Sequence, residues 1–362
     1  MSSRPHNFNA GPAILPLPVL ESARESLLET AGTGLSVLEW SHRSPAYSEV
    51  HEGAERSMRE LLGPASEGYR ILFLQGGASL QFAKVPMNLA SATCPGEYVV
   101  TGAWSKKALA EAKKLSSGRS LWSGQEQNFC RLPDPGEISA SDDAAYLHIT
   151  SNNTIFGTQW QRLPELGSSP LVADMSSDIL SGPLDVSRYG LIYAGAQKNL
   201  GPAGLAVVII REDLLDRVAE TVPGILQYAV HAEAGGLYNT PPTFAVHLMG
   251  LVLKWIQSQG GLTGIDSLNR SKAALLYGQI DSSGYYRGTA AKEHRSRMNV
   301  TFRLPTEDLE KNFLSESADA GFVGLKGHRS VGGLRASIYN AMPEDSVQAL
   351  VDFMREFERT NG

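Results

Sequence analysis

Residues 194–204 read AGAQKNLGPAG, and this loop of small residues decides how the rest of the chain is interpreted. It leaves one apolar run and leads directly into another, so we expect it to connect two strands. Lys198 is the one amine in it. A lysine held at a strand end can act as an imine-forming nucleophile, whereas a solvated loop lysine is the ordinary alternative.

A carboxylate occupies the matching place on the preceding apolar run. Asp174 lies 24 residues before Lys198 and directly follows the apolar residues 171–173. Enzymes that use pyridoxal phosphate need a lysine to hold the cofactor aldehyde as a Schiff base and a carboxylate to pair with the pyridine nitrogen. Because ligands of open α/β sheets bind at the carboxyl ends of strands, the two residues predict a pyridoxal phosphate site.

The chain from Tyr69 onward alternates apolar runs with helical patterns. This alternation predicts an α/β fold with a mostly parallel central sheet that is covered by helices on both faces. Strands are expected at 69–74, 98–100, 145–149, 171–173, 191–193 and 206–210. The loop QGGAS at 75–79 leads into a helix expected over 80–90, so its backbone amides predict an anion site.

The last third of the chain has a different organisation. Helices are expected over 243–257 and 262–280, followed by strands at 298–304 and 333–338 and a final helix over 343–357. This composition predicts a small α+β C-terminal domain. We assign residues 16–260 to a large cofactor-binding domain, and residues 1–15 and 261–362 to the small domain.

Composition excludes several classes of protein. A net charge of −6 argues against a general nucleic-acid binder, and no apolar stretch approaches the roughly 20 residues of a membrane span. Cys94 and Cys130 lack the spacing of metal ligands, so we expect no metal site and two buried, reduced thiols. Residues 1–20 contain four prolines and no apolar signal segment, so a cytoplasmic protein is expected.

Six separated motifs then occur in order along nearly the whole chain: residues 8–13 (FNAGPA), 41–43 (SHR), 195–199 (GAQKN), 239–243 (NTPPT), 327–329 (GHR) and 335–341 (RASIYNA). In these six motifs, and in their order along the chain, the sequence resembles the phosphoserine aminotransferases of the class-V aminotransferase family. The resemblance implies fold type I, pyridoxal 5'-phosphate as cofactor, and a homodimer with shared active sites. It also implies reversible transamination between L-glutamate and 3-phosphohydroxypyruvate, giving O-phospho-L-serine and 2-oxoglutarate in serine biosynthesis. A role in pyridoxine biosynthesis, through 3-hydroxy-2-oxo-4-phosphooxybutanoate, stays open.

The same resemblance implies a role for each cofactor-binding residue. Lys198 would carry the cofactor and move the proton, and Asp174 would pair with the pyridine nitrogen. Trp104 would stack on the ring and Thr154 would bond its phenolic oxygen. The phosphate would be bound by Ala78, Ser79 and Gln197, and from the other subunit by Asn239 and Thr240.

Cations would select the substrate, because each substrate carries at least two anionic groups. By the resemblance, Arg335 would bind the α-carboxylate. The substrate phosphate or side-chain carboxylate would be bound by His42, Arg43, His328 and Arg329, some of them from the partner subunit. Some relatives carry an arginine where this chain has Ser79, so we expect phosphate binding to depend more on the His-Arg pairs.

Two other functions fit parts of this pattern. Another fold type I enzyme, such as a serine–glyoxylate aminotransferase or a cysteine desulfurase, would act on a substrate without phosphate. The two His-Arg pairs favour a phosphorylated substrate instead. A regulatory protein that holds pyridoxal phosphate would need an appended binding module, and the sequence contains no segment of that kind.

Overall fold

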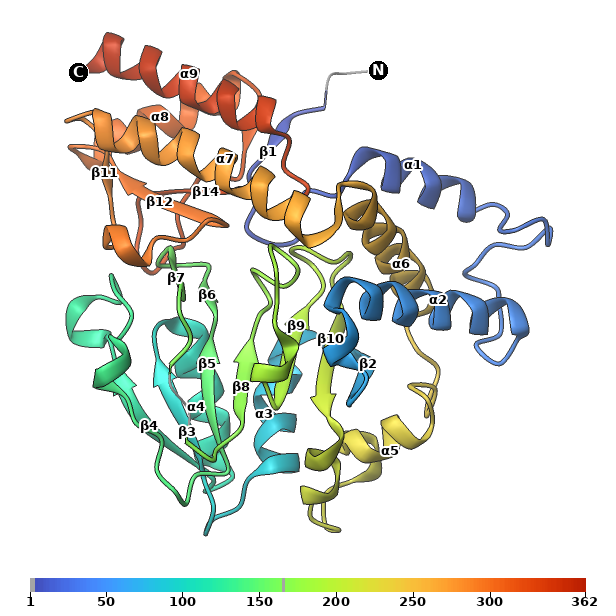
Figure 1. The fold of residues 1–362 in the computed structure, drawn as a ribbon. Coiled ribbons are helices and arrows are strands. Elements are labelled where there is room, and N and C mark those ends of the chain that lie inside the picture. The colour runs from blue at the N-terminus through green and yellow to red at the C-terminus, as the bar shows by residue number, and fades with distance from the viewer. Residues whose placement is uncertain (1–3, 165–166) are drawn as a thin grey trace.

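A seven-stranded sheet forms the centre of the molecule (Figure 1). The computed structural model describes residues 4–164 and 167–362. In the order in which they pair, the strands are β2 (Tyr69–Gln75), β10 (Leu205–Arg211), β9 (Leu191–Gly195), β8 (Leu171–Asp174), β5 (Tyr146–Thr150), β3 (Gly96–Val100) and β4 (Gly118–Ser123). Only β10 runs antiparallel to its neighbours within this sheet, which confirms the predicted mostly parallel arrangement.

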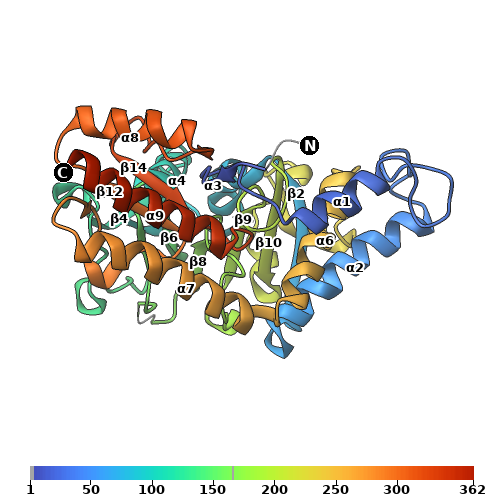
Figure 2. The same ribbon diagram turned by 90° about the horizontal axis from the view of Figure 1, so that it is seen from above.

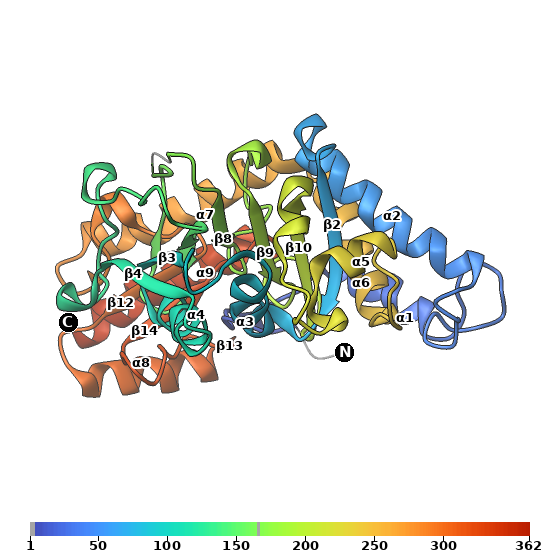
Figure 3. The ribbon, with the colours of Figure 1, turned by 90° about the horizontal axis from the view of Figure 1, so that it is seen from below.

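Helices cover both faces of the sheet, as the sequence predicts (Figure 3). One face packs against α3 (Gly77–Leu89), α4 (Ala103–Lys114) and α5 (Tyr228–Glu233). The other face packs against α1 (Leu17–Ser26), α2 (Pro45–Leu62) and α6 (Thr243–Ser258). Side chains of β2 alternate between the two layers, since Ile71 and Phe73 belong to one core and Leu72 and Leu74 to the other.

A separate hydrophobic core is formed mainly by the C-terminal part of the chain. It is built from the second half of α7 (Gly261–Ser282), β12 (Asn299–Arg303), α8 (Glu307–Asp319), β14 (Leu334–Ser337) and α9 (Glu344–Asn361). β11 (Arg287–Gly288) completes a three-stranded sheet, and β1 (His6–Asn7) pairs with β13 (Phe322–Val323). The first turns of α7 pack in the sheet core through Leu262 and Ile265. The domain boundary stays a prediction, and residues 1–3 of the assigned small domain lie outside the described residues.

Some helices and strands of the structure are not predicted from the sequence. β4 is a partly exposed edge strand, so it lacks the continuous apolar run of its neighbours. The amphipathic helices α1, α2, α4 and α8 were not anticipated either. The expectation of buried thiols was wrong, because Cys94 is exposed and Cys130 is partly exposed, although both are unpaired. Both cysteines lie in loops outside the hydrophobic cores.

An apolar arm extends from the side of the molecule (Figure 2). It comprises the end of α1, the loop that follows, and the start of α2. Leu28, Leu35 and Leu38 of this arm are 83%, 48% and 57% exposed. Exposed leucines that cluster on one projection are unusual for a free surface and indicate an interaction site.

No helix in the described residues is long and apolar enough to cross a membrane.

Candidate active site

Lys198 lies in the loop that joins β9 to the antiparallel β10. The residue is only 9% exposed, and its Nζ donates a hydrogen bond of 2.7 Å to Thr154 Oγ1. Thr154 follows β6 (Asn152–Asn153), which forms a short hairpin with β7 (Thr158–Gln159). Burial lowers the pKa of Lys198 to about 8, although the nearby Asp174 carboxylate opposes that shift. The amine is therefore much closer to its nucleophilic form at neutral pH than an exposed lysine.

Lys198 of the cofactor-free protein is expected to react with amine reagents as a base of pKa about 8. Below that pH the amine is protonated and unreactive, so labelling should rise through about pH 8 and then level off. Exposed Lys311 is the matched control, because its ion pair with Asp308 raises its pKa. Competitive labelling with a trace of acetic anhydride, read by peptide mass spectrometry, measures both. A Lys198 midpoint near 10.5 would contradict a desolvated amine.

Asp174 ends β8 and lies beside Lys198 because β8 and β9 are adjacent parallel strands. Its Oδ1 accepts hydrogen bonds from Ser176 N (3.0 Å) and Ser176 Oγ (2.6 Å). Ser176 Oγ also accepts a bond from Gly195 N, which ties the end of β9 to this turn. Burial raises the pKa of Asp174 despite the Ser176 donors. A buried carboxylate of this kind gains from a cationic partner, such as a protonated ring nitrogen.

One cavity of about 230 Å³ brings these groups together. Its lining includes seven of the sequence-predicted residues: Ala78, Ser79, Trp104, Thr154, Asp174, Gln197 and Lys198. Trp104 supplies a flat apolar wall, and Lys198 Nζ lies 5.9 Å from the centre of its indole ring. Among the described residues there is no group of three or more His, Cys, Asp or Glu side chains that could hold a metal ion.

The cavity has an anion-binding end at the start of α3. Gly77, Ala78 and Ser79 form the first turn of that helix, whose first backbone N–H groups have no partner within the helix. Gly76 precedes them with φ +89°, and a Cβ at this position would lie 2.7 Å from Leu80. Glycine is therefore required for the turn that aims these N–H groups at the cavity.

Three polar atoms of the cavity lining are buried without a hydrogen-bond partner among the described residues: Trp104 Nε1, Thr150 Oγ1 and Gln197 Oε1. Unpaired buried polar atoms are costly, so they indicate a ligand that completes their bonding. The cavity thus offers an amine, a carboxylate, a flat aromatic wall and an anion site. These four features suit a phosphorylated aromatic compound whose flat ring contains a nitrogen and carries a carbonyl group.

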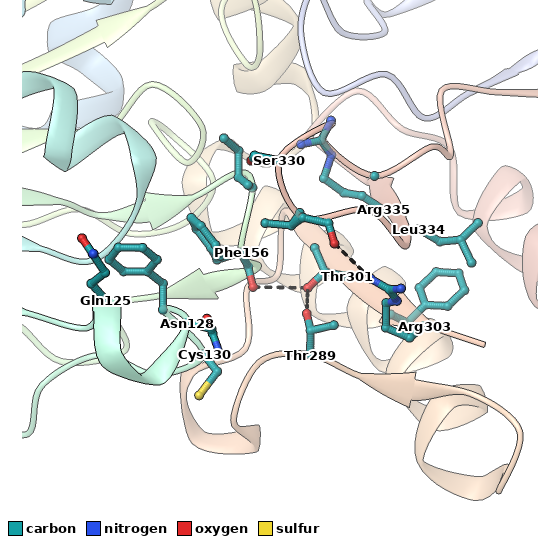
Figure 4. Close-up of a pocket in the computed structure, with 16 residues that line it drawn as sticks. Gln125, Asn128, Cys130, Phe156, Thr289, Thr301, Arg303, Ser330, Leu334 and Arg335 are labelled. Carbon is teal, nitrogen blue, oxygen red and sulfur yellow. Dashed lines mark hydrogen bonds between the residues drawn. The ribbon is translucent and has the colours of Figure 1, made fainter. Parts of the chain in front are cut away.

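Arg335 lies on β14 beside Thr154, to whose carbonyl oxygen its Nη1 donates a bond of 3.2 Å. Figure 4 shows that it also borders a larger cavity of about 530 Å³, where Arg303 bonds the carbonyl of Val331. His328 and Arg329 lie in the loop before β14. Partial burial lowers the pKa of His328, and the positive charges of Arg335 and Arg329 lower it further. The structure therefore brings two guanidinium groups and one imidazole close to each other.

Seven of the predicted residues do not line the Lys198 cavity: Arg335, His328 and Arg329, which lie near each other, and His42, Arg43, Asn239 and Thr240. His42 and Arg43 lie in the loop before α2, in the same projection as the exposed leucines. Asn239 and Thr240 bond to Gln75 at the end of β2, with the Thr240 carbonyl oxygen 2.8 Å from Gln75 Nε2. A single chain therefore does not assemble the whole predicted site.

Other cavity residues were missed from the sequence, namely Phe82, Thr150, Asn152, Ser176 and Ser177. Ser176 carried a local signal, because an Asp side chain readily accepts a bond from the backbone N–H two residues later. The remaining four carried none, since an inward-facing Thr, Asn or Phe looks like any core residue until the sheet is assembled.

The model of the class-V aminotransferases matches residues 6–350, which is nearly the whole chain and includes the Lys198 loop. The chain belongs to the class-V aminotransferase family. This class-V aminotransferase is 55% identical to the phosphoserine aminotransferase of Geobacillus kaustophilus, over 98% of this chain and 99% of that relative. The resemblance drawn from the separated motifs is therefore confirmed.

Solved structures agree with this assignment. A structure that examines radiation damage of the Schiff base in phosphoserine aminotransferase is 53% identical, with a TM-score of 0.96 over 99% of this chain and 100% of that one. A phosphoserine aminotransferase from Trichomonas vaginalis with PLP bound is 40% identical, with a TM-score of 0.92 over 97% of this chain and 100% of that one. This class-V aminotransferase thus has the fold of fold type I aminotransferases.

Proposed function

We propose that this class-V aminotransferase acts as a phosphoserine aminotransferase. It would catalyse the reversible transfer of an amino group from L-glutamate to 3-phosphohydroxypyruvate, giving O-phospho-L-serine and 2-oxoglutarate. One observation carries the proposal: Lys198 and Asp174 meet in a single cavity with an anion site at its end, in a chain that matches phosphoserine aminotransferases along its full length.

Pyridoxal phosphate fits the residues of the cavity. Lys198 would hold the carbonyl carbon, Asp174 would face the pyridine nitrogen, and Trp104 would cover the ring. The phosphate would be bound by the α3 N-terminus at Ala78 and Ser79, with Gln197 beside it. When bound, the cofactor supplies an electron-accepting ring that is conjugated to a carbonyl group.

The protein's own side chains would then carry out the proton transfer. The Lys198 amine is desolvated. It would take a proton from the substrate α-carbon and deliver it to the carbon of the cofactor's carbonyl group. Thr154 orients this amine through its 2.7 Å hydrogen bond. Arg335, whose Nε has no partner among the described residues, has donors to fork onto an α-carboxylate.

Recognition of the substrate phosphate would depend on the two His-Arg pairs. His328 and Arg329 lie near Arg335 in the same chain. His42 and Arg43 belong to the projecting part of the molecule and would reach the site of another copy. Because Ser79 has no positive charge, Arg43 and Arg329 would provide the cationic groups for the phosphate, and the two imidazoles would add hydrogen-bond donors.

A homodimer with shared active sites would account for both the exposed leucines and the scattered site residues. Leu28, Leu35 and Leu38 would be buried by the second copy, and the neighbouring His42 and Arg43 would enter its site. Asn239 and Thr240 would likewise serve the partner's cofactor phosphate. Equilibrium sedimentation tests this arrangement, and a fully active species with the mass of one chain would contradict it.

O-phosphoserine, added alone to the cofactor-loaded protein, is expected to abolish the visible band of the bound cofactor, whereas L-serine should leave most of that band. The difference arises because only the phosphorylated amino acid can bind the His-Arg cations. Absorption spectra recorded before and after each addition measure this response. An equal response to both amino acids would indicate an aminotransferase for non-phosphorylated substrates, and no band after reconstitution would refute the proposal.

Two finer assignments go with this function. Action on 3-hydroxy-2-oxo-4-phosphooxybutanoate would use the same phosphate-binding side chains, and amination of that compound by the purified protein tests it.

We also propose a cytoplasmic location, since unpaired cysteines are typical of reducing compartments. Recovery of the protein from a secreted or periplasmic fraction would contradict that location.

A further inference from the structure

A buried lysine far along the chain binds the segment that follows β14. Lys272 of α7 is only 1% exposed, and its Nζ donates to three backbone carbonyl oxygens: Ile338 (3.1 Å), Tyr339 (2.7 Å) and Asn340 (3.5 Å). Three carbonyl oxygens that converge on one point repel each other unless a cation lies between them. The ammonium therefore stabilises this tight turn.

Burial lowers the pKa of Lys272 to about 7, and the Glu344 carboxylate opposes that shift. The three carbonyl acceptors favour the charged amine as well, because an ammonium can donate to all of them. No acidic side chain is paired with Lys272 among the described salt bridges. Lys272 therefore interacts with the backbone of the turn and not with the carboxylate of an ion pair.

Asn340 connects this turn to the residue next to Lys198. Its backbone N–H donates to Asn199 Oδ1 (3.1 Å), and its side chain is held by Asn269 and by the carbonyl of Leu180. Asn199 Nδ2 in turn donates to the carbonyl of Ile179 (3.3 Å), in the loop that follows Asp174. Asn199 and Asn340 are 5% and 4% exposed, so water does not compete for these bonds.

The other end of the same segment carries Arg335. Only Ala336 and Ser337 separate it from Ile338, the first carbonyl bound by Lys272. Arg335 and Lys198 both bond to Thr154, through its carbonyl oxygen and its hydroxyl respectively. A shift of the turn would therefore move the substrate-binding guanidinium and the amine relative to each other.

We propose that Lys272 is a positioning residue for the aminotransferase reaction. Its ammonium fixes the turn of residues 338–340, and Asn340 and Asn199 transmit that position to Lys198, Asp174 and Arg335. Lys272 itself touches neither substrate nor cofactor. The inference rests on the proposed function, because it assigns Lys198 the transfer of the proton.

Lys272→Met tests this role, since methionine has a similar length but neither charge nor donors. We expect the half-reaction of the loaded enzyme with O-phosphoserine to slow at least about tenfold, because sub-ångström misplacement of a catalytic amine is costly. The concentration of O-phosphoserine for half-saturation should rise by a smaller factor than the rate falls, because a shift of Arg335 affects the α-carboxylate contact and leaves the phosphate contacts in place. The labelling midpoint of Lys198 in the cofactor-free protein should also move by at least about 0.5 pH unit.

Asn199→Ala provides a second route to the same result, because it removes the Oδ1 that accepts the Asn340 backbone N–H and leaves the ammonium in place. Lys311→Met, at an exposed position, is the matched control and should leave both readings unchanged. If folded Lys272→Met has the wild-type half-reaction rate and Lys198 midpoint, the proposal is overturned, even when its melting temperature falls. If that variant does not fold, wild-type values for Asn199→Ala overturn it.

Failure of the proposed function would look different. The wild-type protein would then give no phosphate-dependent spectral response, before any variant is compared. The labelling midpoint of Lys198 needs no cofactor, so it would still decide whether Lys272 sets the environment of that amine.

Discussion

Lys198→Ala is expected to lower turnover at least about 10⁴-fold, because the change removes both the cofactor-binding amine and the group that moves the proton. Lys198 is the one lysine among the described residues that line the cavity, so no neighbouring amine stands ready to replace it. The fold should survive, since the Ser176 donors still bond the buried Asp174 side chain. Steady-state assay of phosphoserine formation measures the loss.

Lys311→Ala is the matched control for this experiment, since it removes an exposed lysine outside the site. The visible spectrum adds an independent reading, because the alanine variant should bind the cofactor without the band of a lysine-bound carbonyl. Residual activity above about one per cent of wild type, in protein free of contaminating aminotransferase, would overturn the assignment of Lys198.

Asp174→Asn is expected to lower kcat about 100-fold or more, because it removes the negative charge that would hold the ring nitrogen protonated. Asparagine has the same shape, and its amide oxygen can still accept the Ser176 bonds at 3.0 and 2.6 Å. The loss would therefore report the charge rather than the packing. Rates of the half-reaction with O-phosphoserine measure it at the step concerned.

Asp178→Asn is the control for loss of a carboxylate in the same loop. Asp178 bonds to Ser151 and Gln159, does not line the Lys198 cavity, and has its pKa raised by burial to about 6. We expect its kcat to remain within about threefold of wild type. Equal losses in both variants would mean that any carboxylate in this loop matters, and would contradict a specific role for Asp174.

The sheet and the placing of Asp174 beside Lys198 could be predicted because each rests on local patterns. Buried parallel strands are continuous apolar runs, so their ends are readable, and two polar residues at successive ends point to one edge. β4 has no such run, because one of its sides is unpaired and its side chains are partly exposed.

Other features depend on tertiary packing that no local pattern records. His42 and Arg43 lie outside the cavity of their own chain, so spacing alone could not show which site they serve. Lys272 occupies a helical pattern like any surface lysine, and only the convergence of three carbonyl oxygens reveals its burial. A family resemblance transfers roles to individual residues but does not give the bonds that hold them.

The reversed direction of β10 means that Lys198, unlike the anion site, lies at a strand end that is not followed by a helix. β2 leads into α3 and β3 into α4, and both helices begin beside the cavity, where their dipoles direct positive potential toward a bound anion. The chain returns from β9 to the antiparallel β10 through a short loop, so no helix begins at Lys198 in that fully described stretch. The lysine therefore has no helix dipole at its own backbone, where added positive potential would repel the proton that its amine must accept.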